Sequence, residues 1–296
     1  MEAVTLVANA GWDRRILVCR CGTLVDTWIV VTERFVVLVD TMDGPESAAA
    51  LLDLARPHLT GRQLLVINTH AHWDHVWGNQ VFAGPQALHP APIIATRACA
   101  AQLASGEAAT TLAEMQGKDP AGFAAVRLTP PTVLFDGALR IEGGDLTLEL
   151  LPAPGHADDQ VVVWIPEIAT LLAADAVELP FPFAESATAL PVIRATLTML
   201  AALDARTALY CHAPETAGPD LIQANLAYFQ TLEERCRAAL AADATADPPA
   251  DADVEALVGF PFAELRPLGQ AVTQPEFYRP GHRQHIRLML RWLAGG

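Results

Sequence analysis

The sequence is poor in basic residues and lacks long uninterrupted apolar runs. Nineteen basic residues, of which only Lys118 is lysine, oppose 34 acidic ones, and the formal net charge is −15. This charge disfavours long-range attraction to nucleic-acid phosphates or anionic membranes. No apolar run approaches the ~18 residues that cross a bilayer, and residues 1–5 lack the features of a secretory signal. We therefore expect a cytoplasmic protein with no nucleic-acid or membrane partner.

Cysteine is also scarce. The five cysteines are an odd number in 296 residues, and a chain of this length needs no disulfide framework. We therefore expect a reducing compartment, with Cys19 and Cys21 packed on one face of a strand instead of forming a thiol site. The 52% hydrophobic content permits a large core. This composition leaves the oligomeric state open and is compatible with a homodimer.

Short apolar runs alternate with helix-like segments along most of the chain. After the run at residues 35–39, the segment 43–46 has a capping aspartate, a proline and an acid, which are typical of a helix start. Alternation of strand, helix and strand indicates an α/β layered fold. We expect strands at residues 15–19, 27–31, 35–39, 64–68, 92–96, 133–135, 138–141, 146–151, 161–165, 170–174 and 208–211, and helices at 45–56, 76–82, 187–203 and 221–240, with two short helices within 97–126.

The composition changes near the C-terminus. Residues 242–253 are rich in alanine, proline and aspartate and have little to bury, which predicts a linker. Residues 1–241 are then the main domain, and residues 254–296 a short helical extension. The first domain has two strand-rich halves without a sequence repeat, which suggests a two-fold sandwich.

A cluster of histidine and aspartate follows the apolar run at residues 64–68. It reads His70-Ala71-His72-Trp73-Asp74-His75. A buried strand would deliver these side chains to the loop at its carboxyl end, where open α/β sheets place their sites. A chance cluster of this composition is improbable, and alternate histidines followed by aspartate and histidine suit two adjacent metal ions.

Four more candidates lie at or shortly after the ends of other strand-like runs. They are Asp40, His156, Asp175 and His212. Any one of them alone would more often be a turn or capping residue. Their shared position at strand ends is what indicates one site.

With these residues the sequence resembles the metallo-β-lactamase-fold hydrolase superfamily, in particular its glyoxalase II-like and lactonase-like dinuclear members. The resemblance covers residues 5–240 and rests on the His-x-His-x-Asp-His cluster with a later His, Asp and His. It implies a four-layer αββα sandwich of two mixed sheets flanked by helices. It also implies one ion bound by His70, His72 and His156, a second ion bound by Asp74, His75 and His212, Asp175 as a bridge, and Asp40 as the acid that orients a ligand by hydrogen bonding.

Two departures from the family pattern bear on function. The last motif reads Cys211-His212-Ala213-Pro214, where relatives often have glycine on both sides of the histidine. The bridging position is Asp175, where true β-lactamases usually have cysteine or serine, so antibiotic hydrolysis is a poor primary interpretation. We expect Cys211 to be structural, because its side chain points away from that of His212.

The ligand types favour two divalent ions, zinc first, with iron or manganese as alternatives. Two such ions lower the pKa of a shared water toward ~7, which gives a hydroxide nucleophile at neutral pH. We expect attack on an ester, thioester or lactone carbonyl of a small molecule, with Asp74 orienting the nucleophile and passing its proton to the leaving group. The alternatives are a non-haem iron oxidoreductase acting on a sulfur substrate and, disfavoured by the charge, a nuclease or phosphodiesterase.

Aromatic residues close to the predicted ligands are candidates for substrate contact. They are Trp73, Trp77, Phe181 and Phe183, and packing in the core is an equally good interpretation. The last 18 residues also hold a basic stripe with a spacing of four, Arg279, Arg283, Arg287 and Arg291, which either covers the active site or pairs with acidic neighbours. His282 and His285 form a weak candidate for a further metal site.

Overall fold

The first of two β-sheets contains the seven strands β1 to β7 in sequence order. The computed structural model describes residues 3–213, 216–272 and 274–295. Strands β1 to β4 are antiparallel, whereas β4 to β7 are parallel. The strands are β1 Val4–Leu6, β2 Ile16–Cys21, β3 Val25–Val31, β4 Phe35–Val39, β5 Gln63–Ile67, β6 Ile93–Thr96 and β7 Val133–Phe135.

The second sheet is also mixed and contains five strands in the order β12-β11-β10-β9-β8. Only the β11–β12 pair is parallel. The strands are β8 Leu139–Glu142, β9 Thr147–Pro152, β10 Val161–Ile165, β11 Thr170–Leu172 and β12 Thr207–Leu209. The predicted α/β fold of two mixed sheets is confirmed, while β1 was missed.

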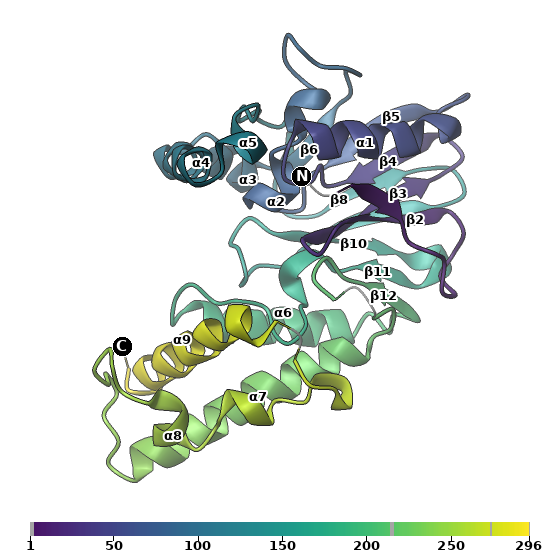
Figure 1. Ribbon diagram of the computed structural model, residues 1–296. Helices are drawn as coiled ribbons and strands as arrows, with labels where there is room; N and C mark the ends of the chain where they lie inside the picture. Colours follow the sequence, from purple (N-terminus) through teal and green to yellow (C-terminus); the bar gives the residue numbers. More distant parts are fainter. Residues whose placement is uncertain (1–2, 214–215, 273, 296) are drawn as a thin grey trace.

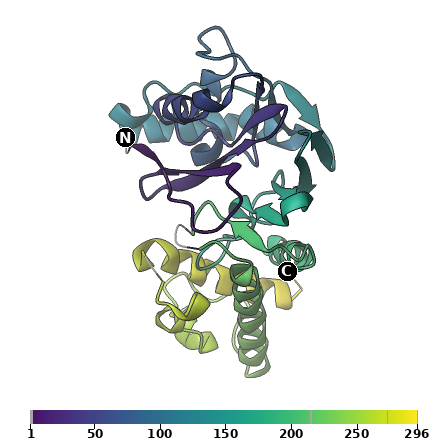
Figure 2. The same cartoon turned by 90° about the vertical axis from the view of Figure 1, so that its right-hand side faces the viewer.

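Helices cover both outer sides of the paired sheets (Figure 1). The view turned by 90° shows the same succession, with helices above the first sheet and helices below the second (Figure 2). The helices beside the first sheet are α1 Pro45–Ala55, α2 Trp73–Val76, α3 Arg97–Leu103, α4 Gly106–Lys118 and α5 Pro120–Phe123, and those beside the second are α6 Ala189–Ala201, α7 Asp220–Ala241, α8 Val254–Val258 and α9 Pro275–Leu293.

Successive side chains along the strands of the second sheet pack alternately into two apolar cores. Val163 and Leu172 pack in the core between the sheets, whereas their neighbours Val162 and Leu171 pack in the core shared with α6 to α9. Since successive strand side chains point to opposite faces, both faces of this sheet must be apolar. The part of the second sheet that β10 and β11 form is therefore buried on both sides.

The C-terminal segment packs into this outer core. Ile286 and Met289 of α9 are fully buried in the same cluster as Val162 and Leu171. Residues 242–253, expected to be a linker, are fastened to α9 because the Arg287 guanidinium donates hydrogen bonds to the carbonyl groups of four of them. In this structure residues 254–272 and 274–295 are packed as part of the helical layer.

The arginine stripe of α9 pairs with acidic and carbonyl groups. Arg279 and Arg283 both bond to Glu255 of α8, at 2.9 and 2.6 Å, and Arg291 pairs with Asp247. Of the two alternatives for the stripe, the structure favours pairing with neighbours over a cover for the active site.

We expect Glu255→Gln to lower the free energy of unfolding by about 2 kcal/mol at pH 7. Burial alone would raise the pKa of Glu255. The hydrogen bonds from Arg279 and Arg283 outweigh burial, and the net effect lowers this pKa from 4.5 to about 2. Solvent screens part of the gain, because the arginine side chains are 49% and 47% exposed. The stabilisation is complete above pH 4.5 and is lost as the pH falls toward 2. Urea unfolding of both proteins at pH 7 and pH 3 should show the difference shrinking at pH 3; an equal difference at both pH values would contradict the ion-pair account.

Within the described residues, no helix is both long and apolar enough to cross a membrane. All five cysteines are buried.

Candidate metal centre

The predicted ligands meet because they follow parallel neighbouring strands. Asp40 and His70 follow β4 and β5, which pair in parallel, and Asp175 and His212 follow β11 and β12, which also pair in parallel. The two sheets are joined at this edge, where the backbone N–H of Val161 donates to the carbonyl oxygen of Thr69 at 2.9 Å. The carboxyl ends of strands from both sheets therefore converge.

The first group of candidate ligands consists of His70, His72, His156 and Asp175. One donor atom from each lies within 4.8 Å of all the others. Nε2 of His156 is 3.0 Å from Nδ1 of His72, and it is 3.5 Å from Oδ2 of Asp175. These nitrogen and oxygen donors converge on one small volume.

The second group consists of Asp74, His75 and His212, again with donor atoms within 4.8 Å of one another. Nε2 of His212 lies 3.4 Å from Oδ2 of Asp74, and Nε2 of His75 lies 3.8 Å from the same oxygen. Asp74 and His75 are on α2, which begins directly after His72. The short helix therefore presents these two side chains to His212.

A single oxygen lies between the two groups. Oδ2 of Asp175 is 3.7 and 3.5 Å from the Nε2 atoms of His70 and His156, and 3.2 and 3.3 Å from those of His75 and His212. Asp175 is in the 3-10 turn that follows β11, where the preceding residue, Ala174, has a φ of 45°. This position is the one that a bridging carboxylate requires.

The donor set fits divalent metal ions. In a tetrahedral zinc site, ligand atoms are about 3.3 Å apart, because the metal–ligand distances are about 2.0 Å. The donor separations given above span 3.0 to 3.8 Å. Nε2 of His70 and Nε2 of His75 are buried and have no hydrogen-bond partner among the described residues, a costly state unless a cation occupies the site.

Hydrogen bonds set the orientation of His70 and His75. The carboxylate of Asp40 accepts from His75 Nδ1 at 2.8 Å, from the Thr69 amide at 2.7 Å and from the Thr69 hydroxyl at 2.8 Å. Because that hydroxyl donates its hydrogen bond to Asp40, its oxygen accepts a hydrogen bond from His70 Nδ1 at 3.0 Å. Both histidines thus carry their proton on Nδ1 and present a lone pair on Nε2.

Asp40 adopts an uncommon backbone conformation to do this. Its φ is 69°, in the left-handed region that non-glycine residues seldom occupy, and it is fully buried. Gly78 allows α2 to approach closely, since a Cβ there would overlap the carbonyl oxygen of Thr41. The amide of Thr41 in turn donates to the carbonyl of His75 at 2.7 Å.

The electrostatics of the site favour cations. Burial lowers the pKa of His70 well below its usual range and that of His72 to about 4. Burial also opposes the charging of His75 and His212, but Asp175 and Asp74 outweigh it and raise both pKa values well above 6.5. The carboxylates of Asp175 and Asp74 therefore attract positive charge to this part of the site.

Glu178 is a site residue that the sequence analysis did not single out. Its carboxylate is 3% exposed, and its Oε1 lies 3.2 Å from Nδ1 of His156. Burial raises the pKa of Glu178. Burial also opposes the charging of His156, but the nearby Glu178 carboxylate outweighs burial and raises the pKa of His156. The available signal was an isolated acid in the otherwise apolar segment 176–184.

Two of the four aromatic residues expected to contact substrate are buried. Trp77 is 2% exposed and packs with Trp73 against Phe123 of α5. Phe181 is fully buried and stacks on Tyr228 at a centroid distance of 4.5 Å. Trp77 and Phe181 are thus core residues in this structure, because the aromatic rings of α5 and α7 pack against them. Trp73 and Phe183 are partly exposed.

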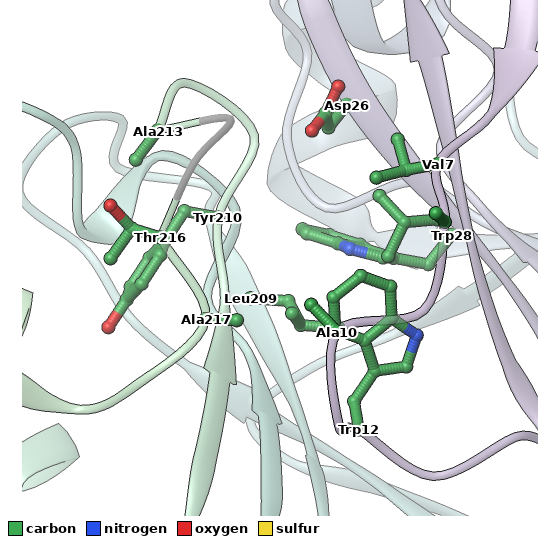
Figure 3. A pocket seen from close by; sticks show the side chains of 12 residues that line it. Val7, Ala10, Trp12, Asp26, Trp28, Leu209, Tyr210, Ala213, Thr216 and Ala217 are labelled. Atoms are coloured by element: carbon green, nitrogen blue, oxygen red, sulfur yellow. The ribbon is translucent and has the colours of Figure 1, made fainter.

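A cavity of about 270 Å³ borders the loop after His212. Figure 3 shows Tyr210, Ala213 and Thr216 on one side of it and Trp12 and Trp28 on the other. Among the described residues, its lining includes none of the candidate ligands. The cavity is therefore next to the metal centre along the chain but is not the centre itself.

Cys211 lies close to Asp40 and His75. Burial is the main reason that its pKa is raised well above 9.0, and the surrounding carboxylates raise it further. A neutral buried thiol is a poor nucleophile and a poor metal ligand. Its packing in the core between the sheets agrees with a structural role.

Two packed mixed sheets with helices outside and histidine–aspartate groups at their shared edge define a class of metal-binding α/β sandwich. The family model of the metallo-beta-lactamase superfamily matches residues 22–212, which include every candidate ligand, and the chain belongs to this superfamily. No curated protein matches the sequence.

Solved structures share the fold. A metallo-beta-lactamase family protein from Thermus thermophilus is 22% identical, with a TM-score of 0.62, and the match covers 91% of this chain and 89% of that one. A metallo-beta-lactamase from Pontibacter korlensis is 20% identical, with a TM-score of 0.56, over 77% of this chain and 99% of that one. At these identities the likeness shows the fold alone. Family membership together with the two His/Asp groups supports a metal-dependent hydrolase.

Proposed function

We propose that this protein is a dinuclear metal-dependent hydrolase that cleaves an ester, thioester or lactone bond of a small molecule. The observation that supports it most is the position of Asp175, whose Oδ2 lies 3.2 to 3.7 Å from imidazole nitrogens of both ligand groups. Such an oxygen suits two ions that share a carboxylate. Zinc is the favoured metal, and iron or manganese would accept the same donors.

The chain's own residues divide the work of such a reaction. Two divalent ions, when bound, supply Lewis acidity toward a carbonyl oxygen and a water of lowered pKa. Asp40 and Thr69 hold the lone pairs of His75 and His70 toward the centre, as their hydrogen bonds indicate. Asp74, whose side chain is 12% exposed, is the carboxylate best placed to accept the water's proton and deliver it to the leaving group.

The acidic surface argues against a polyanionic substrate. A net charge of −15 repels nucleic-acid phosphates, and we infer that a small molecule binds instead. A non-haem iron oxidoreductase acting on a sulfur substrate is the alternative that the same ligand set permits.

The first experiment is metal analysis of freshly purified protein, followed by a panel of ester, thioester, lactone and phosphodiester substrates. We expect close to two divalent ions per chain, and turnover of carbonyl substrates that chelation abolishes and added Zn²⁺ restores. One iron per chain with consumption of oxygen would favour the oxidoreductase. Hydrolysis that survives complete metal removal would overturn the proposal.

A further inference from the structure

Glu178 and the helical layer outside the matched region point to a control on one of the two metal sites. We propose that Glu178 is a positioning residue that holds His156 toward the site shared with His70 and His72, and that Asn225 of α7 and His285 of α9 fix the segment that carries Glu178. This inference rests on the proposed metal centre.

His156 needs such a partner because it lies on a loop. It is between β9 and β10 and follows Gly155, whose φ is 131°. Its Nε2 faces His72 and Asp175, while its Nδ1 faces Oε1 of Glu178 at 3.2 Å. A carboxylate at this distance favours the proton on Nδ1 and the lone pair on Nε2. Glu178 thus lies beside Nδ1 of His156, at 3.2 Å, as Asp40 lies beside Nδ1 of His75, at 2.8 Å.

Asn225 fixes the backbone of Glu178 on both sides. Its Oδ1 accepts from the Glu178 amide at 3.2 Å, and its Nδ2 donates to the carbonyls of Glu178 and Pro180 at 2.9 and 3.0 Å. Asn225 is fully buried, and these bonds use its carbonyl and both amide protons. Its side chain is fully committed to this segment.

The other end of the segment is held by a buried chain of hydrogen bonds. Nε2 of His285 accepts from the Ala184 amide at 2.9 Å, so its Nδ1–H donates to the Tyr228 hydroxyl at 3.1 Å. That hydroxyl donates to Nδ1 of His282 at 2.9 Å, and Nε2–H of His282 donates to the carbonyl of Phe260 at 2.8 Å. Both ring nitrogens of His282 and of His285 are thereby hydrogen-bonded. The two histidines therefore anchor α9 and have no nitrogen left to bind a metal.

Asn225 and His285 both lie beyond residue 212, where the family match ends. The helical layer therefore reaches the metal centre through residues 178–184. Phe183 adds a packing contact, because it stacks on Tyr278 of α9 at a centroid distance of 5.6 Å. Loss of the contacts that hold residues 178–184 should loosen one metal site and spare the other.

The test is a titration of chelator-treated full-length protein with Zn²⁺, repeated with Co²⁺ so that the ligand field can be followed by visible absorption. We compare wild type with Glu178→Gln, Glu178→Leu and Asn225→Ala. Glu178→Leu should weaken one of the two sites 10- to 100-fold and change its Co²⁺ spectrum. Glu178→Gln keeps an acceptor for His156, so it should lose less, and Asn225→Ala should weaken the same site.

Glu255→Gln is the matched control, since it removes another buried carboxylate that contacts α9 but leaves residues 178–184 unchanged. It should bind both ions as wild type does. Near-wild-type affinity at both sites in folded Glu178→Gln and Asn225→Ala, as judged by near-UV circular dichroism, would overturn the inference even if Glu178→Leu fails to fold. A wild-type protein that binds no divalent ion would overturn the metal centre itself, and the inference with it.

Discussion

Replacing Asp175 by alanine is expected to reduce bound metal from two ions per chain to one or fewer and to lower kcat/KM by a factor on the order of 10³ or more. The carboxylate lies within 3.7 Å of imidazole nitrogens from four histidines, so its loss removes an oxygen donor from both groups at once. It also leaves four imidazoles, three of them buried, facing one another with less compensating charge. Metal analysis and steady-state kinetics on the substrate found in the panel would measure both effects.

Two variants separate charge from shape in this experiment. Asp175→Asn keeps the side-chain volume but loses the negative charge, and it should resemble the alanine variant in metal content. Asp145→Asn removes a carboxylate that pairs with Arg15 in the turn between β8 and β9, and its metal content should equal that of wild type. Two ions in Asp175→Ala would refute the bridging role.

The location of the site could be predicted because each ligand follows an apolar strand. Residues 64–68 are β-branched or leucine for the most part, and this pattern predicted β5 with His70 directly beyond its end. Parallel pairing of β4 with β5 and of β11 with β12 then places four strand ends side by side. Local pattern and the rule that sites lie at carboxyl strand ends were together sufficient.

The local structure around the cluster was harder to predict. A helix was expected from residue 76, but α2 begins at Trp73 and is followed by the 3-10 turn Asn79–Val81. A helix of four residues leaves no periodic pattern to detect. Its start matters, because it turns Asp74 and His75 toward the second group.

Partners distant in sequence could not be predicted either. His282 and His285 were a weak metal candidate, whereas their shared partner is the hydroxyl of Tyr228, more than 50 residues earlier. The same holds for Glu178 and His156, whose contact depends on how residues 178–184 cross the end of the second sheet. Tertiary packing decides such contacts, and the spacing of residues in the sequence does not indicate them.

Asp74 is where proton transfer should be tested. Its side chain and that of His212 are 12% and 17% exposed, whereas those of His70 and His75 are fully buried and that of His156 is 7% exposed. Asp74 and His212, together with the partly exposed His72 of the first group, therefore line the part of the centre that water and substrate can reach. The Asp74→Ala variant is expected to fold, to keep the ion of the first group and to lose turnover by a factor on the order of 10³.

Leaving-group dependence distinguishes a proton donor from a simple ligand. Asp74→Asn keeps an oxygen beside His212 but cannot carry a proton at neutral pH. If Asp74 delivers a proton to the leaving group, esters of poor leaving groups such as alkyl alcohols should lose 10²- to 10⁴-fold, while nitrophenyl esters, whose leaving group needs no proton, should lose far less. Equal losses across such a series in a variant that still binds two ions would assign Asp74 to metal binding alone, and the proton would then have to leave by way of solvent.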